Sequence, residues 1–251
     1  MSFSIGKKAV LTDLVLNLDA SNRISYPGIG GSWYDISGYG NHFTLTGTPT
    51  WTGKAFTFNE NGGNHYAQCI NNTCGNFGTD SFTIEYVVSM PTSTATNGSS
   101  CLISKRSTYV VIGGAGEGYR GWMERNTNGF FVQDNNPDGF TNDYAGIINL
   151  TATPYDNTLY HIVQTVKRNG TQATGSQYKN GVLNGAIDTV DFAAGVAGDG
   201  IISNTSYWQI FAGAAGGYTT GSMYLMRAYS RALTAAEVQT NYQSIRSKLG
   251  I

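Results

Sequence analysis

The stretch DNNPDGFTND, residues 134–143, has the residue types and spacing that best suit metal chemistry. Asp134, Asn136 and Asp138 stand at alternate positions before a glycine, and calcium takes several oxygen ligands from a loop of this kind. Asp143 adds a carboxylate, but Ala145 stands where the helix–loop–helix calcium motif carries glutamate. Turns rich in Asn, Asp, Pro and Gly also join strands without an ion. The sequence requires no cofactor and leaves calcium as an open alternative.

Three aromatic residues in glycine-rich contexts, Tyr119, Trp122 and Tyr218, are candidates for carbohydrate binding. An exposed ring stacks on a sugar face while nearby polar groups bind the hydroxyls, which suits a neutral glycan. For Trp122 a core position is an equal alternative, because a large aromatic side chain is usually highly buried.

The acidic residues do not form the carboxylate pair that glycoside hydrolysis requires. Glu85 alternates with the apolar residues of its expected strand, so we expect it to face solvent. The three histidines have no zinc-ligand spacing with the cysteines, and no nucleophile or phosphate-loop motif is present. The sequence therefore predicts a protein that is not an enzyme and has no catalytic residues.

The low content of charged residues limits the classes of partner that the sequence favours. Charged residues make up 12% of the 251 residues and the net charge is −1, with no basic cluster, so we expect neither nucleic acid nor a membrane surface as a partner. No apolar run is long enough to span a bilayer, and the N-terminus lacks the pattern of a secretory signal. Three cysteines do not describe a disulfide framework; Cys69 and Cys74 are either free thiols or a pair across a short loop.

The elements that would position these residues are mostly strands. Alternating or short apolar segments between turn residues predict strands at 14–18, 55–58, 82–88, 102–104, 129–132, 161–166, 208–212 and 222–229. Asn180-Gly181 between apolar pairs predicts a tight hairpin. Abundant glycine, with 33 residues, fits many strands joined by turns. The length suits one β-sandwich domain.

One helix is expected at the C-terminal end. Thr234 and Glu237 have the spacing of a capping box, and Leu233 is placed to pack against Val238. Apolar residues then recur at helical spacing as far as Leu249, before a glycine stop.

The order of these features resembles the laminin-G-like branch of the concanavalin A-like lectin/glucanase superfamily. The resemblance covers nearly the whole chain: LVLNLDASNRISYPGIGGSWYDISGYGNHFTLTG, FTFNENGGNHYAQ, DSFTIEYVV, LISKRS, LYHIVQTVKRNG with QYKNGVLNG, and GSMYLMRAYSRALTAAEVQTNYQSIRSKLG. It implies an all-β fold, an antiparallel jelly-roll β-sandwich with one short C-terminal helix that covers the sandwich edge. Residues 1–251 would form a single domain, with 1–12 as an N-terminal arm. Asp35, Ser37 and Asn41 would have structural roles in turns.

The opening block also looks like a subtype frequent in structural proteins of tailed bacteriophages. That resemblance implies a non-enzymatic virion protein, assembled in the host cytoplasm, that displays the jelly roll on a capsid or tail and contacts shell or tail proteins, with homo-oligomers as a further expectation. The alternative is a carbohydrate-binding lectin or adhesion module for a cell-surface glycan. A glycoside hydrolase is the least favoured of the three, since the paired carboxylates are missing.

Overall fold

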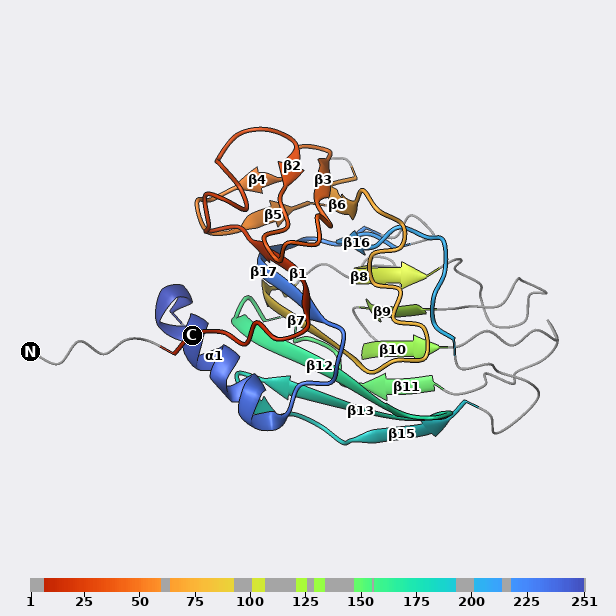
Figure 1. Ribbon diagram of the computed structural model, residues 1–251. Coiled ribbons are helices and arrows are strands. Elements are labelled where there is room, and N and C mark those ends of the chain that lie inside the picture. The colour runs from red at the N-terminus through yellow and green to blue at the C-terminus, as the bar shows by residue number, and fades with distance from the viewer. Residues whose placement is uncertain are drawn as a thin grey trace, which may run out of the picture.

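The computed structural model describes residues 7–59, 64–92, 101–106, 121–125, 129–133, 147–154, 156–192, 201–213 and 218–250. In these ranges the chain forms two antiparallel sheets and one C-terminal helix (Figure 1). The predicted all-β sandwich with a single C-terminal helix is confirmed. Of the candidate residues, Tyr119, Asp134, Asn136, Asp138 and Asp143 lie outside the described residues.

Sheet A contains the longest strands. Its members are β1 (Leu14–Asp19), β4 (Thr50–Trp51), β5 (Phe56–Phe58), β7 (Phe82–Ser89), β12 (Leu159–Asn169), β13 (Gln172–Lys179), β14 (Val182–Leu183), β15 (Asp188–Asp191) and β17 (Gly221–Tyr229). In the described residues their order is β14-β13-β12-β7-β17-β5-β4, with β1 also paired to β17 and β15 to β13. The strand β17 is therefore central: β7 lies on one side, and β5 and β1 share the other.

Sheet B lies opposite. Its members are β2 (Ser32–Trp33), β3 (Phe43–Thr46), β6 (Tyr66–Cys69), β8 (Cys101–Arg106), β9 (Gly121–Arg125), β10 (Gly129–Gln133), β11 (Ile147–Leu150) and β16 (Gln209–Ile210). The order of these described strands is β11-β10-β9-β8-β16-β6-β3-β2. The short β16 bridges β8 and β6, so a segment late in the chain joins two early strands.

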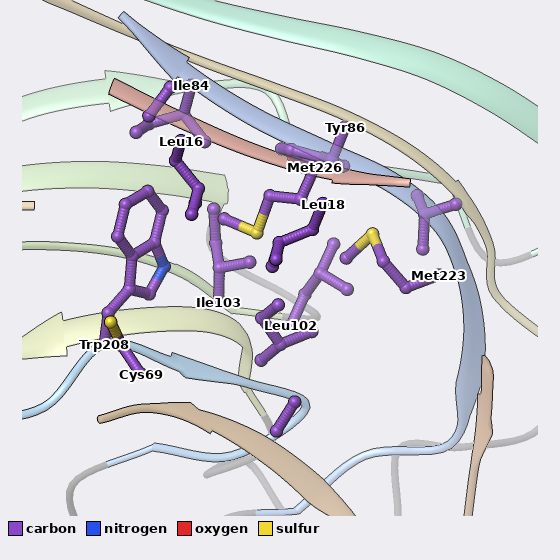
Figure 2. Close-up of a cluster of buried hydrophobic side chains, with 14 of the residues drawn as sticks. Leu16, Leu18, Cys69, Ile84, Tyr86, Leu102, Ile103, Trp208, Met223 and Met226 are labelled. Atoms are coloured by element: carbon purple, nitrogen blue, oxygen red, sulfur yellow. The ribbon is translucent and has the colours of Figure 1, made fainter. Parts of the chain in front are cut away.

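The core fills the space between the sheets. Figure 2 shows Leu16 and Leu18 of β1 meeting Leu102 and Ile103 of β8. Trp208 is fully buried and its ring centroid lies 6.1 Å from that of Phe43. Burying each such side chain contributes about 2 kcal/mol relative to leaving it in water.

The predicted hairpin is present. Asn180 and Gly181 join β13 to β14 with positive φ angles of 51° and 80°, which a tight two-residue turn needs at both positions.

The helix α1 (Ala235–Leu249) begins as predicted, with Thr234 as N-cap in a complete capping box and Gly250 as a left-handed C-cap. Leu233 and Val238 share one buried cluster, as expected. The prediction that the helix covers the sandwich edge is wrong. The helix lies on the outer face of sheet A, away from β8 to β11 (Figure 1), because its Val238 and Ile245 pack against side chains of the central strands.

The position of α1 on sheet A also explains why β7 is more buried than its sequence pattern predicts. The alternation in β7 predicts a half-buried strand, but all its residues except the last are buried. Val87 packs under Ile245 of α1, while Ile84 faces the core between the sheets. Val10, in the segment expected to be an N-terminal arm, is also held at the helix, because its N–H donates to Asn241 Oδ1 over 2.8 Å.

In the described part of the chain, no helix is long and apolar enough to cross a membrane.

Candidate functional site

Two aromatic rings meet on the outer face of sheet B. Tyr66 begins β6, where Ala67 and Cys69 point into the core, so the alternation of the strand turns Tyr66 and Gln68 outward. Tyr218, one of the predicted sugar-binding residues, forms a β-bridge with Ala212. Its ring centroid lies 5.9 Å from that of Tyr66, at an interplanar angle of 38°. Both tyrosines are partly exposed.

A pair of amides lies beside these rings. Gln68 and Gln209 are register partners on β6 and β16, and Gln209 Nε2 donates to Gln68 Oε1 over 3.0 Å. This bond fixes both side chains while leaving the second N–H of one amide and the second carbonyl lone pair of the other for a ligand. Tyr66 and Gln68 are two residues apart on one strand, so their Cα atoms are about 7 Å apart.

Hydroxyl groups extend the surface over the neighbouring strand. Thr44 of β3 pairs with Gln68 and is exposed, and Thr46 pairs with Tyr66 and is half-buried. We call Tyr66, Gln68, Gln209 and Tyr218, with this threonine rim, the tyrosine–glutamine patch. No member carries a charge. The patch thus offers an aromatic surface with neutral donors and acceptors, which is the chemistry that binds an uncharged sugar.

Trp122, chosen as a candidate for its glycine-rich context, lies in a strand and not in a loop. It belongs to β9 and pairs with Lys105 of β8 and Val132 of β10. The side chains of both partners are buried. Trp122 therefore belongs to sheet B, in the strand between β8 and β10.

Glu85 was expected to face solvent, and this is wrong. Its side chain is fully buried between β7 and α1, where four neighbours reach it. His161 Nε2 lies 3.1 Å and Arg227 Nη1 3.2 Å from Oε1, and Oε2 accepts from the Tyr229 hydroxyl over 3.0 Å and from Asn241 Nδ2 over 2.7 Å. The sequence pattern missed this network because its partners come from three other elements.

The ionisation of Glu85 follows from these contacts. Burial alone would raise the pKa of this carboxyl, but the Arg227 guanidinium, followed by the His161 ring and the Tyr229 hydroxyl, lowers the pKa to about 2. Burial and the Glu85 charge in turn raise the pKa of the Tyr229 hydroxyl. A carboxylate held ionised and sealed under a helix cannot donate a proton to a substrate, so this network is structural.

Other polar candidates are structural too. The Asp35 carboxylate accepts from the backbone N–H groups of Asn17, Ser37 and Asn41 over 2.8, 2.9 and 3.0 Å, as the structural interpretation of this turn predicted. Across the described ranges, no group of three or more His, Cys, Asp or Glu side chains is gathered closely enough to hold a metal ion.

Comparison with solved structures finds chains that share this β-sandwich fold. The binding domain of Paraclostridial Mosquitocidal Protein 1 is similar to this chain at 19% identity with a TM-score of 0.59, over 92% of this chain and 52% of that one. The ligand binding domain of botulinum neurotoxin serotype D, in complex with N-acetylneuraminic acid, is similar at 14% identity with a TM-score of 0.62, over 93% and 51%. Trypanosoma rangeli sialidase is similar at 16% identity with a TM-score of 0.57, over 96% and 36%.

This chain therefore spans about half or less of each of those chains. No family model matches the sequence, and a search of curated proteins finds no match. At these identities the similarity shows the fold, and the more specific assignment to a laminin-G-like or phage subtype stays a prediction.

Proposed function

We propose that this chain is a non-enzymatic, lectin-like module that binds a neutral carbohydrate through the tyrosine–glutamine patch. The observation that carries the proposal is the Tyr66–Tyr218 ring pair beside the hydrogen-bonded amides of Gln68 and Gln209. One of the similar solved structures is a domain in complex with a sugar acid, which supports carbohydrate as the ligand class.

The patch has the features that sugar binding needs. The partly exposed rings give an apolar surface for the C–H face of a pyranose, and stacking there costs little conformational entropy because tyrosine has few rotatable bonds. The amide pair is fixed before a ligand arrives, so less ordering is required on binding.

The non-enzymatic part rests on Glu85. This carboxylate lies on β7, the middle strand in the described order of sheet A, and its network occupies both oxygens on the face covered by α1. A retaining or inverting glycosidase instead needs two carboxyl groups facing one glycosidic bond. At 16% identity the sialidase among the similar structures shares the fold with this chain, and its reaction is not part of the proposal.

The test is a glycan array followed by calorimetric titration of the best neutral ligand. We expect Tyr66→Ala and Tyr218→Ala each to weaken binding at least tenfold, which corresponds to a loss of about 1.4 kcal/mol. Tyr39→Ala is the matched control, because Tyr39 is 66% exposed and lies outside the patch. A flat array, or equal losses in all three variants, would refute the proposal.

Placement on a tailed-phage particle, as a capsid decoration or tail component, is a finer proposal. The solved structures named above are toxin and sialidase chains, so this placement rests on the sequence resemblance alone. Mass spectrometry of purified particles, before and after a wash in strong salt, tests it. Finding the chain in the soluble lysate and never on particles contradicts it.

A further inference from the structure

The Lys105 side chain ends inside the protein, in a cluster of neutral oxygens. Lys105 belongs to β8 and is fully buried. Its ammonium donates to Asn72 O over 2.6 Å, to Asn204 O over 3.2 Å, to Asn204 Oδ1 over 3.4 Å and to Ser206 O. In the described part of the chain no carboxylate forms an ion pair with this ammonium. We call these four oxygens the oxygen cluster.

The ammonium joins segments that belong to three neighbouring strands of sheet B. Asn72 follows β6, Ser206 precedes β16 and Lys105 lies on β8, and these strands are adjacent in the order β8-β16-β6. The chain thus supplies its own cation at the point where these segments meet. The oxygen cluster includes no residue of the tyrosine–glutamine patch, so the two sites are separate.

The oxygen cluster is held in place by bonds that do not involve the ammonium. Asn76 Nδ2 donates to Asn204 O over 3.0 Å, and the Asn204 N–H donates back to Asn76 Oδ1 over 3.1 Å. The Ser206 N–H donates to Asn204 Oδ1 over 2.9 Å, and Asn204 Nδ2 donates to the backbone carbonyl of Lys105 over 3.2 Å. All four bonds are still possible when the lysine side chain is shortened.

The turn that contains Asn72 is fixed in the same way. The Cys74 N–H donates to Asn71 O over 3.2 Å, and Asn71 Oδ1 accepts from the Thr73 N–H over 3.0 Å. Because neither bond includes the ammonium, the Asn72 carbonyl should also stay in place without it. The oxygen cluster is therefore a preformed site.

The charge and number of these oxygens favour a singly charged ion. Calcium takes about six to eight oxygen ligands, usually with carboxylates among them, whereas this cluster has four neutral oxygens. An ammonium has three N–H donors, and a buried ammonium needs hydrogen bonds to offset the loss of water. Burial lowers the pKa of Lys105 to about 8, so the side chain is still mostly protonated at pH 7. The cluster therefore matches a primary ammonium ion in charge and in hydrogen bonding.

We infer that the oxygen cluster is a binding site for a primary ammonium ion, which the Lys105 side chain occupies in the native chain and which a free alkylammonium enters when that side chain is shortened. Lys105→Ala removes Cγ, Cδ, Cε and Nζ, and these are the heavy atoms of propylammonium. The free ion therefore fits the space left by the side chain and brings the N–H donors that the oxygens need.

The first experiment uses Lys105→Ala in the full chain, with propylammonium chloride as the probe. Removing the ammonium leaves buried oxygens without a donor, so we expect the melting temperature to fall by about 10 °C. Propylammonium at about ten times its dissociation constant should restore about 4 °C, because a ligand of the folded state stabilises it by mass action. Calorimetric titration should show binding at one site.

Matched additives separate this site from a general effect of salt or solvent. Equal concentrations of 1-propanol, which has no charge, and of tetramethylammonium chloride, which has no N–H, should give no such rise. Lys54→Ala is the matched control, because Lys54 is exposed, and neither this variant nor the native chain should respond to propylammonium. Equal effects of the additives, or equal responses of the two variants, would overturn the inference.

Lys105→Met tests the same site with a smaller change. Methionine keeps a side chain of nearly the same length without the charged nitrogen, so ammonium chloride should raise the melting temperature of this variant more than sodium chloride does. In the folded native chain, reductive methylation should modify Lys54 and leave Lys105 unmodified, as peptide mass spectrometry measures. Equal methylation of the two lysines, or equal effects of the two salts on Lys105→Met, would also overturn the inference.

Discussion

Asn241 of α1 donates its side-chain N–H to Oε2 of Glu85 on β7 across 2.7 Å. The two residues are 156 positions apart in sequence, and both are fully buried. The same amide donates to the Tyr229 hydroxyl over 2.9 Å, and its oxygen accepts from Val10 N–H. One polar residue on the inner side of the helix thus connects the helix, two central strands and the N-terminal segment.

This connection predicts the effect of Asn241→Ala. The substitution leaves a buried Glu85 oxygen without one donor and the partly buried Val10 N–H without its acceptor, so the free energy of unfolding should fall by about 2–3 kcal/mol. Chemical denaturation measures it. Gln243→Ala on the same helix, where no buried partner is lost, should change stability by about 0.5 kcal/mol or less; equal effects would contradict the prediction.

Acid should unfold the protein through Glu85. Its pKa is about 2 in the folded chain against an ordinary value of 4.5. The ionised Glu85 side chain therefore stabilises the folded state at pH values above 4.5, and this stabilisation is lost as the pH falls from 4.5 towards 2. The shift corresponds to about 3 kcal/mol. Glu85→Gln should flatten the fall in unfolding free energy over this window, measured by urea denaturation at several pH values.

Glu237 provides the comparison. Its pKa is also lowered to about 2, chiefly by its hydrogen bonds with Arg231, but the pair is partly exposed and water screens it. Glu237→Gln should therefore flatten the acid dependence less than Glu85→Gln. The reverse order would mean that the buried network does not control acid stability.

The sequence was sufficient for the sandwich and for both ends of the helix. Alternation, the Asn180-Gly181 turn and the Thr234 capping box depend on neighbours in the chain, so local patterns report them. Glu85 was misplaced because alternation says which residues share a face and not what covers that face. Here a helix more than 100 residues later covers it.

Sequence patterns identified only part of the candidate site, because they do not show which strands lie side by side. Tyr218 was selected for its glycine-rich surroundings, but its partner Tyr66 belongs to a different strand and only the sheet register brings them together. The alternation of HYAQC, with small apolar residues at Ala67 and Cys69, was the signal that could have identified Tyr66 and Gln68 as an outward pair.

The helix cap gives a third prediction. Thr234 Oγ1 accepts from the Glu237 N–H, and the Glu237 carboxylate accepts from the Thr234 N–H over 2.9 Å. Thr234→Ala should lower the free energy of unfolding by about 1 kcal/mol. Thr240→Ala is the control, because its hydroxyl bonds to the Ala236 carbonyl within the helix and alanine is the better helix former. If Thr240→Ala lowers the free energy of unfolding as much as Thr234→Ala does, the predicted stabilisation by the cap is wrong.

Calcium binding at Asp134, Asn136, Asp138 and Asp143 stays a prediction from their spacing. If the loop holds the ion, millimolar calcium should raise the melting temperature and release or absorb heat in a titration, because a ligand of the folded state stabilises it by mass action. Asp134→Asn with Asp138→Asn should abolish both effects, and Asp80→Asn, an exposed change elsewhere, should abolish neither. If calcium changes neither quantity in the native chain, the prediction of a calcium site is wrong.

The neutrality of the tyrosine–glutamine patch gives the last prediction. The proposed binding uses stacking on Tyr66 and Tyr218 and uncharged hydrogen bonds to Gln68 and Gln209. Salt does not screen these two kinds of interaction in the way that it screens a charge pair. The affinity for a neutral glycan should therefore change less than twofold between low and about 1 M salt, measured by calorimetry. A sialylated glycan should gain no affinity over its neutral counterpart, since the patch offers its carboxylate no cation. If the sialylated glycan binds tenfold more tightly and loses this advantage in salt, the ligand is held by a cationic site elsewhere on the chain and not by this patch.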